Sequence, residues 1–359
     1  MIVVMEPGAS QAAVEAVEAR IRAAGHGVHV SRGAERTIVG AIGDERRLEP
    51  EVFESMPGVE RAMHVVKPYR LVSRECRAAP TVVRIGDAAI GGDEVQVIAG
   101  PCSVETDAQM AQSADAVARG GARLMRGGAF KPRTSPYAFQ GLGIEGLRML
   151  KRAASAHGLP VVTELMDAVQ LDAFLAEGVD AIQIGTRNMQ NFDLLKAVGR
   201  VDVPVVLKRG MSATIAEWLM AAEYVAAGGN HRIVLCERGI RTFETAYRNV
   251  LDVTAIPYVK RESHLPVIVD PSHAGGKAWM VGALACAAVA AGADGLLVEV
   301  HPCPSEAWCD ADQALAPDDF AALTTRLAAV AAATGRRLSP PREDPALAPV
   351  AREPEPEAA

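Results

Sequence analysis

Positively charged side chains recur between residues 126 and 238, most of them where a short apolar run ends. The planar guanidinium fork of arginine suits phosphate and carboxylate oxygens. Cations gathered at one place repel one another unless an anion offsets their charge. The pattern therefore predicts a site for substrates with several negative charges, and a solvated rim with neighbouring carboxylates is the alternative. The set comprises Arg126, Lys131, Arg133, Arg187, Lys208, Arg209 and Arg238.

A second set combines a thiol, an imidazole and two carboxylates: Cys102, His273, Glu299 and Asp310. Groups of these types bind divalent transition metals when they converge. Their spacing gives little support, because the sequence contains neither a CxxC nor an HExxH motif. A small buried Cys102 and a hydrogen-bonded loop His273 are the alternatives to a metal site.

The elements that must position both sets alternate regularly from Val95 onward. Short apolar runs are separated by amphipathic stretches at 108–119, 144–157, 168–177, 215–227 and 277–291. Eight such repeats predict a (β/α)8 barrel, whose chemistry lies at the carboxyl ends of its strands. A doubly wound open sheet is less favoured because no switch point is evident. The expected strands are 95–99, 122–126, 161–164, 181–184, 205–208, 233–236, 267–269 and 295–300.

Residues 1–68 follow a different pattern, with apolar runs and helical stretches in the order βαββαβ. This order is typical of a small ferredoxin-like domain. Residues 69–94 are expected to form a connector with a hairpin, and 95–335 the barrel. The tail, 336–359, is rich in Pro, Glu and Ala, and is expected to be disordered because it lacks apolar residues to offset its ordering entropy.

Composition excludes several classes of function. The formal net charge is −7 and only 4% of residues are aromatic, which argues against nucleic-acid binding. No apolar run is long enough to span a membrane, and the N-terminus does not resemble a signal peptide. The six cysteines are therefore expected to be thiols in a reducing cytoplasm.

Ordered motifs along the chain resemble those of 3-deoxy-D-arabino-heptulosonate 7-phosphate (DAHP) synthases, type I branch with an N-terminal ferredoxin-like regulatory domain. They are AGPCSVE, RGGAFKPRTSPYAFQG, VVTELMD, QIGTRNMQNF, LKRGM, CERGIRTFE, DPSHAGGK, VEVHP and CDADQAL. The resemblance implies condensation of phosphoenolpyruvate and D-erythrose 4-phosphate with water to DAHP and phosphate. This reaction is the first step of the shikimate pathway to chorismate and the aromatic amino acids.

The resemblance also implies residue roles. Cys102, His273, Glu299 and Asp310 would bind one divalent ion (Mn, Fe, Co or Zn), with Asp312 the alternative to Asp310. Phosphoenolpyruvate would be held by Arg126, Lys131, Arg187, Lys208, Arg238 and the backbone N–H of Thr186, where relatives often have Ala. Erythrose 4-phosphate would be held by Lys131, Pro132, Arg133, Thr134, Ser135 and Asp270.

Glu164 would lie near phosphoenolpyruvate. Lys131, Glu164 and His273 are the residues expected to take part in catalysis, His273 as a metal ligand, and the first two have an alternative role. Lys131 would protonate the developing alkoxide or serve only to bind phosphate. Glu164 would orient the water or make a structural hydrogen bond at the rim. On oxidation, Cys303 or Cys309 would form a disulfide with Cys102 and expel the metal. The alternative is that Cys303 and Cys309 are solvated free thiols.

The N-terminal domain is expected to bind an aromatic amino-acid effector, Tyr or Phe, at a subunit contact of a homodimer or homotetramer. A packing or oligomerisation role is the alternative. The rival activity is that of 3-deoxy-octulosonate 8-phosphate synthase, which uses arabinose 5-phosphate; KPRTSP argues against it, since that family's loop resembles KANRSS. A catalytically inactive protein that only binds an effector is disfavoured because the charged residues at the strand ends are all present.

Overall fold

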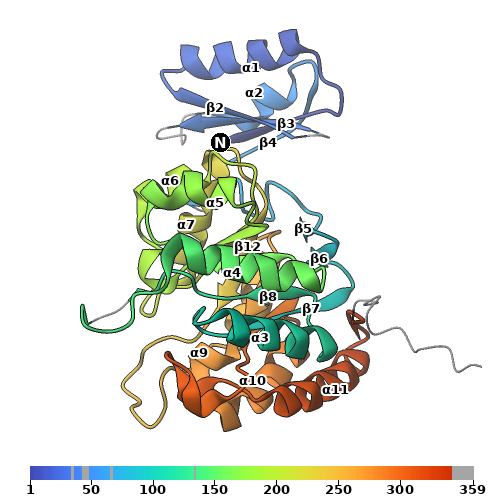
Figure 1. The fold of residues 1–359 in the computed structure, drawn as a ribbon. Coiled ribbons are helices and arrows are strands. Elements are labelled where there is room, and N and C mark those ends of the chain that lie inside the picture. Colours follow the sequence, from blue (N-terminus) through green and yellow to red (C-terminus); the bar gives the residue numbers. More distant parts are fainter. Residues whose placement is uncertain (34–35, 43–47, 65–67, 133–134, 342–359) are drawn as a thin grey trace, which may run out of the picture.

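The N-terminal domain and the barrel lie next to each other in the computed structural model (Figure 1). The structure describes residues 1–33, 36–42, 48–64, 68–132 and 135–341. The sheet of the small domain faces the barrel, and its helices lie on the opposite side (Figure 1).

The N-terminal domain has the predicted βαββαβ order. Its elements are β1 (Ile2–Met5), α1 (Gln11–Ala23), β2 (Gly27–Arg32), β3 (Thr37–Ile42), α2 (Pro50–Glu54) and β4 (Val59–Met63). The strands form an antiparallel sheet in the order β2-β3-β1-β4. Helix α1 begins where the Ser10 side chain accepts from the N–H of Ala13, and its buried stripe of Val14, Val17 and Ile21 packs on the sheet.

The connector ends in a hairpin that closes the amino end of the barrel. Strands β5 (Val83–Ile85) and β6 (Ala88–Ile90) pair antiparallel. Their apolar side chains, including Val83 and Ile85, join one buried cluster with inward-facing barrel residues such as Ile98 and Ile268. The hairpin therefore supplies part of the barrel's own core.

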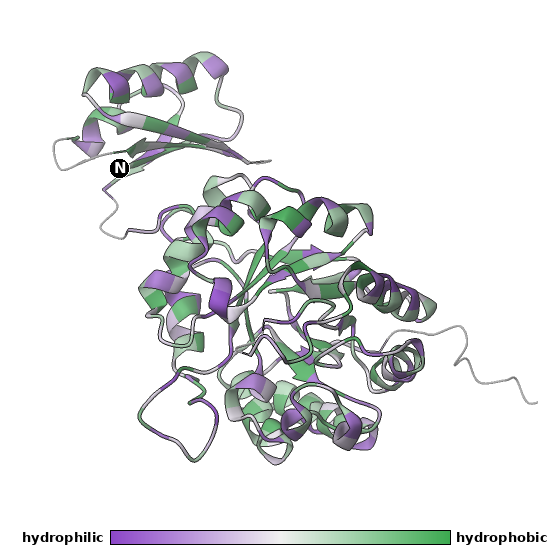
Figure 2. Cartoon of the chain, turned by 60° about the vertical axis from the view of Figure 1, so that its left-hand side comes forward, coloured by the Kyte–Doolittle hydropathy of each residue, from purple (hydrophilic) through white to green (hydrophobic). Residues whose placement is uncertain are grey.

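Eight parallel strands form the barrel, and the pairing of β14 with β7 closes it. Their residues are almost all buried, as expected for strands covered on both faces, and most of them are hydrophobic (Figure 2). The strands are β7 (Glu94–Gly100), β8 (Leu124–Arg126), β9 (Val161–Glu164), β10 (Ala181–Ile184), β11 (Val205–Lys208), β12 (Ile233–Glu237), β13 (Val267–Val269) and β14 (Gly295–Glu299). The closed-barrel prediction is confirmed.

Helices surround the barrel with their apolar faces inward (Figure 2). The stretch expected at 168–177 begins as a 3-10 turn, η2 (Ala168–Gln170), before α5. The helices are α3 (Asp107–Arg119), α4 (Gly143–Ala156), α5 (Leu171–Ala176), α6 (Phe192–Val198), α7 (Ile215–Ala227), α8 (Ala255–Glu262), α9 (Pro271–Gly275), α10 (Ala278–Ala290) and α11 (Pro317–Ala333).

Ordered structure extends past the expected end of the barrel at 335. Strand β15 (Arg337–Leu338) pairs with the start of β7. Arg336 anchors this segment by donating to the carbonyl of Ala293 at 2.6 Å. The rest of the predicted disordered tail, 342–359, lies outside the described residues. Within the described ranges, no helix is long and apolar enough to cross a membrane.

Candidate active site

The carboxyl ends of the strands enclose a small polar cavity of about 90 Å³. Its lining residues come from segments far apart in the sequence and include all five cations that the resemblance assigns to phosphoenolpyruvate. The lining comprises Arg126, Lys131, Pro132, Glu164, Gln183, Gly185, Thr186, Arg187, Lys208, Arg238, Arg248, His273 and Asp310. Both sets of residues recognised in the sequence therefore contribute side chains to one cavity, the cationic set through five residues and the second set through His273 and Asp310.

The cations of the cavity are only partly neutralised by protein groups. Arg126 donates to Glu299 at 2.9 Å, and Lys208 donates to Asp270 at 2.5 Å. Within the described part of the chain, buried Nε of Arg126, Nη1 of Arg238 and Oγ1 of Thr186 have no hydrogen-bond partner. Buried donors left unpaired are costly, so they indicate room for a ligand with acceptor oxygens.

Arg209 departs from the expectation that it joins this cationic set. Because side chains alternate along a strand, the residue after Lys208 points away from the cavity. Arg209 pairs instead with Glu237 at 3.0 Å and Asp252 at 2.8 Å, and its guanidinium lies 6.0 Å from the ring centre of Trp218. Its role is to join β11, β12 and the following loop.

Glu164 and Thr186 lie side by side at the ends of β9 and β10. The short 3-10 helix η3 (Thr186–Asn188) begins directly after Gly185. A Cβ built on Gly185 would lie 1.9 Å from Glu164 Oε1. Glycine is therefore required here for the Glu164 carboxylate to reach the cavity, where Gln183 donates to its other oxygen at 3.3 Å.

Lys131 lies between the cationic set and the cysteine. Its Nζ donates to the carbonyl of Cys102 at 2.8 Å and approaches Cys102 Sγ to 3.1 Å. Pro132 also lines the cavity, whereas Ser135 is exposed and accepts from the N–H of Tyr137. Arg133 and Thr134 lie outside the described residues. Asp270 sits fully buried behind Lys208 and His273.

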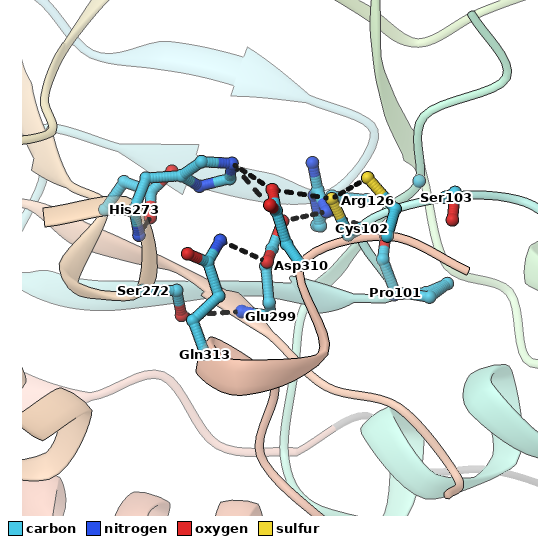
Figure 3. Close-up of polar contacts among 12 residues, drawn as sticks. Pro101, Cys102, Ser103, Arg126, Ser272, His273, Glu299, Asp310 and Gln313 are labelled. Atoms are coloured by element: carbon cyan, nitrogen blue, oxygen red, sulfur yellow. Dashed lines mark hydrogen bonds and ion pairs between the residues drawn. The ribbon is translucent and has the colours of Figure 1, made fainter. Parts of the chain in front are cut away.

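Cys102, His273, Glu299 and Asp310 converge (Figure 3), and Lys131 Nζ lies beside Cys102. One potential ligand atom from each lies within 4.8 Å of those of the others. Cys102 follows β7, His273 lies in α9 just after β13, and Glu299 ends β14. Asp310 lies in the next loop with a φ of 52°, a left-handed conformation that aspartate tolerates better than most residues.

Carboxylates surround the imidazole of His273. Its Nδ1 lies 2.7 Å from Asp270 Oδ2, while Nε2 faces Glu299 Oε1 at 3.4 Å and Asp310 Oδ2 at 3.9 Å. Burial lowers the pKa of His273, which favours the neutral ring. A neutral ring with Nδ1 turned to a carboxylate leaves Nε2 available to a metal, as in many carboxylate–histidine–metal sites.

The carboxylates and the thiol differ in protonation. Against the effect of burial, Arg248 and His273 lower the pKa of Asp310 to about 2. His273 and Arg126 likewise lower the pKa of Glu299. A hydrogen bond with Cys309 and burial raise the pKa of the Cys102 thiol well above its usual value. A metal ion is the charge that would favour the thiolate here.

Asp310 and Asp312 point in different directions. Asp310 Oδ2 accepts from Cys102 Sγ at 3.3 Å, whereas Asp312 pairs with Lys277 at 2.6 Å on the surface. Of the two neighbouring cysteines, Cys309 lies with its Sγ 3.5 Å from that of Cys102. Cys303 instead approaches Ser305.

Sequence reasoning missed Arg248 and Gln313. Gln313 Nε2 donates to Glu299 Oε2 at 2.6 Å (Figure 3), and Arg248 donates to Gln313 Oε1 at 2.6 Å. The sequence signal that could have identified Gln313 is its place after Asp310 in the motif CDADQAL. Arg248 comes from the long loop between β12 and α8, whose path into the cavity no local pattern reveals.

Comparison with known families assigns both parts of the chain. The model described as the DAHP synthetase I family matches residues 73–334. The model described as the DAHP synthase ferredoxin-like domain matches residues 1–67. The chain belongs to the DAHP synthetase I family. Its activity is accordingly the condensation of phosphoenolpyruvate with erythrose 4-phosphate, the entry reaction of aromatic biosynthesis.

Individual relatives agree with this assignment. The chain is 47% identical over 339 residues to a phospho-2-dehydro-3-deoxyheptonate aldolase of Thermotoga maritima, covering 94% of this chain and 100% of the relative. A crystal structure of a DAHP synthase from Thermotoga maritima, 46% identical, matches with a TM-score of 0.75 over 94% of this chain and 98% of that one. A 2-dehydro-3-deoxyphosphooctonate aldolase of Syntrophotalea carbinolica is 38% identical, over 67% of this chain and 92% of the relative.

Proposed function

We propose that the cavity at the carboxyl ends of the strands holds both substrates of the condensation beside one divalent ion. Phosphoenolpyruvate would bind Arg126, Lys131, Arg187, Lys208, Arg238 and the backbone of Thr186. Erythrose 4-phosphate would bind Lys131, Pro132, Arg133, Thr134, Ser135 and Asp270. The observation that carries the proposal is that unpaired cationic donors line the same cavity as His273 and Asp310, two members of the Cys102 cluster.

The donor set fits a divalent transition metal. Atoms bonded to one ion at about 2.0–2.3 Å lie within roughly 4.6 Å of each other, close to the 4.8 Å spread of Cys102, His273, Glu299 and Asp310. A thiolate with a neutral imidazole and two carboxylates suits Mn, Fe, Co or Zn better than Mg or Ca. When bound, such an ion supplies Lewis acidity toward the aldehyde oxygen of erythrose 4-phosphate.

In the proposed reaction, C3 of phosphoenolpyruvate attacks the aldehyde carbon of erythrose 4-phosphate, and cationic character develops at C2. Water adds at C2, and the resulting hemiketal phosphate loses phosphate by C–O cleavage. The cationic side chains hold two phosphorylated anions close together and offset their repulsion. Their contribution is positioning and preorganised charge rather than covalent chemistry.

Two residues of the cavity are suited to proton transfer. Lys131 lies beside the metal-ligand cluster, so its Nζ would give a proton to the oxygen of the former aldehyde. Glu164 lines the cavity from the end of β9, the strand next to β8, where its carboxylate would accept a proton from the attacking water. If Lys131 serves only to bind phosphate, Lys131→Arg should keep the pH dependence of the wild type. That result would contradict the role of Lys131 as a proton donor.

The experiment that tests the proposal measures phosphate release from phosphoenolpyruvate with either aldose, with and without a chelator. We expect rapid release with erythrose 4-phosphate, loss of activity on chelation and recovery on adding Mn²⁺ or Zn²⁺. Faster release with arabinose 5-phosphate would favour the octulosonate activity of the relatives that match about two thirds of the chain. Undiminished activity in metal-free enzyme would refute the metal assignment.

We further propose that the N-terminal domain binds an aromatic amino-acid effector, Tyr or Phe. Support comes from a cavity of about 280 Å³ between its sheet and the barrel, lined by Ile38 and Ile42 on one side and by Arg70 and Glu223 on the other. Deleting residues 1–68 is expected to retain catalysis and abolish inhibition by Tyr and Phe. Inhibition that persists would place the effector elsewhere.

A homodimer or homotetramer is proposed as the working assembly. Tyr137 and Phe243 are each 97% exposed on loops that follow barrel strands, and large exposed aromatics are typical of association surfaces. Sedimentation of the wild type should give a mass of two or four chains, and Phe243→Ser should shift it toward the monomer. The cytoplasmic location expected from the sequence remains a prediction.

A further inference from the structure

In each of the two carboxylates of the metal-ligand cluster, one oxygen faces another of the four ligands. The second oxygen contacts a residue outside the cluster. Glu299 Oε1 faces His273 Nε2 at 3.4 Å, while Oε2 accepts from Gln313 at 2.6 Å (Figure 3). Asp310 Oδ2 accepts from Cys102 at 3.3 Å, while Oδ1 lies 3.6 Å from Arg248 Nη1. Both carboxylates are thereby presented through a single oxygen.

Gln313 links Glu299 to Arg248 through its amide, and Arg248 in turn approaches Asp310. It is 1% exposed, and its Nε2 contacts an acceptor that can only accept while its Oε1 contacts Arg248, which can only donate. This chemistry fixes the orientation of the amide. Neither Glu nor an apolar residue reproduces both bonds, since Glu would set a second carboxylate against Glu299.

Arg248 is itself anchored to the segment that carries His273. Its N–H donates to the carbonyl of Gly275 at 3.3 Å, and the side chain of the next residue, Asn249, donates to the carbonyl of His273 at 3.0 Å. A Cβ on Gly276 would lie 2.5 Å from Arg248 Cβ, so the backbone approaches closely here. The loop after β12 is therefore fastened to α9.

We propose that Arg248 and Gln313 are positioning residues that form one chain from α9 to β14 and hold the carboxylates of Glu299 and Asp310 ready to bind the metal through one oxygen each. The inference rests on the metal site of the proposed function. It adds two residues to that site and makes the loop between β12 and α8 a support for metal affinity. Partners behind metal ligands commonly contribute about 10–100-fold to affinity.

The test titrates metal-free enzyme with Zn²⁺ against a chromogenic chelator, so that the readout is the dissociation constant and not activity. Gln313→Met and Arg248→Met are expected to raise the Zn²⁺ dissociation constant by about 10–100-fold. The double variant should lose little more than the larger single effect, because both residues act through one chain of hydrogen bonds. Thermal unfolding of the metal-free proteins checks that each variant is folded. Because the Arg248 side chain is partly exposed, its substitution is less disruptive to folding than that of Gln313.

Lys277→Met is the matched control. It removes the 2.6 Å pair with Asp312 in the same region but touches none of the four ligands, so its Zn²⁺ affinity should equal that of the wild type. Wild-type affinity in both Gln313→Met and Arg248→Met would overturn the inference, and so would an equal loss in Lys277→Met. A raised KM for either substrate at unchanged Zn²⁺ affinity would make Arg248 a substrate-binding residue instead. Failure of the wild type to bind Zn²⁺ would overturn the proposed metal site itself.

Discussion

The rim of the barrel and the N-terminal domain stabilise themselves in opposite ways. At the rim, Arg126, Lys131, Lys208, Asp270 and Glu299 are all nearly inaccessible to solvent. Among the described residues of the N-terminal domain, the buried side chains are all apolar. Burying charge costs free energy even when it is paired, whereas an apolar core is favourable throughout. The contrast indicates that the rim is arranged to bind charged ligands, whereas the interior of the small domain is stabilised by apolar packing.

The largest effect on activity is expected from Cys102→Ser at the rim. Removing the thiolate should cost the metal and several kcal/mol of transition-state stabilisation, or roughly 10³-fold in kcat/KM. Activity assays with metal analysis of the purified protein would check this. Cys286→Ser, on the outer helix α10, is the control and should keep both metal and activity. A fully active, metal-free Cys102→Ser enzyme would contradict the metal site.

In the N-terminal domain, Phe53→Ala is expected to act on stability alone. Phe53 is 2% exposed in the apolar core, so its truncation should destabilise the domain by about 3–5 kcal/mol. Calorimetry should show an early transition for this domain, while kcat without effector stays within about twofold of wild type. A comparable loss of kcat would mean that the two regions are not independent.

Oxidation is expected to affect the rim selectively. Cys102 and Cys309 lie with their Sγ atoms 3.5 Å apart, so hydrogen peroxide should convert the two thiols to a disulfide and itself be reduced to two molecules of water. The disulfide would remove a metal ligand, and bound Zn²⁺ should slow its formation. Peptide mapping and activity after thiol reduction would check this. Cys309→Ser should resist inactivation; equal sensitivity would rule the pair out.

The smallest effect concerns pH and the seam between connector and barrel. Burial lowers the pKa of His264 to about 4, and its ring is held neutral between Thr81 and the carbonyl of Leu71. As pH falls below the unfolded value of 6.5, the unfolded chain gains a proton that the folded chain does not, so stability falls. The loss from pH 7 to 5 should be about 2 kcal/mol, measured by denaturant unfolding. His264→Gln should remove this part of the acid sensitivity.

The architecture could be predicted from the sequence because its signals are local. Runs such as Val205, Val206 and Leu207 are apolar, and the alternation with helices recurs along the barrel. The cationic set and the four candidate ligands could be recognised because strand ends meet at one rim. Arg209 shows the limit of this reasoning, since one step along β11 reverses the direction of the side chain.

Contacts made through loops were harder to predict: the sequence gives no signal for Arg248, and for Gln313 only its place in a motif. Arg248 reaches the cavity from a loop fastened to α9 by backbone hydrogen bonds, and Gln313 is placed by a turn after Asp310. The 3-10 start of the stretch at 168–177 and the late strand β15 depend on capping by Asp167 and on pairing with β7. Such details are set by tertiary contacts rather than by periodicity.

The hairpin β5–β6 has a consequence for the order in which the chain is made. Its apolar residues leave the ribosome before any strand of the barrel whose interior they fill, so Val83, Ile85 and Ile90 must await their partners. The position at which the N-terminal domain can be exchanged without disrupting the barrel therefore lies before the hairpin and not after it. A gene fusion that replaces the N-terminal domain up to residue 68 keeps the hairpin with the barrel, while a fusion made at residue 92 replaces the hairpin with a foreign segment.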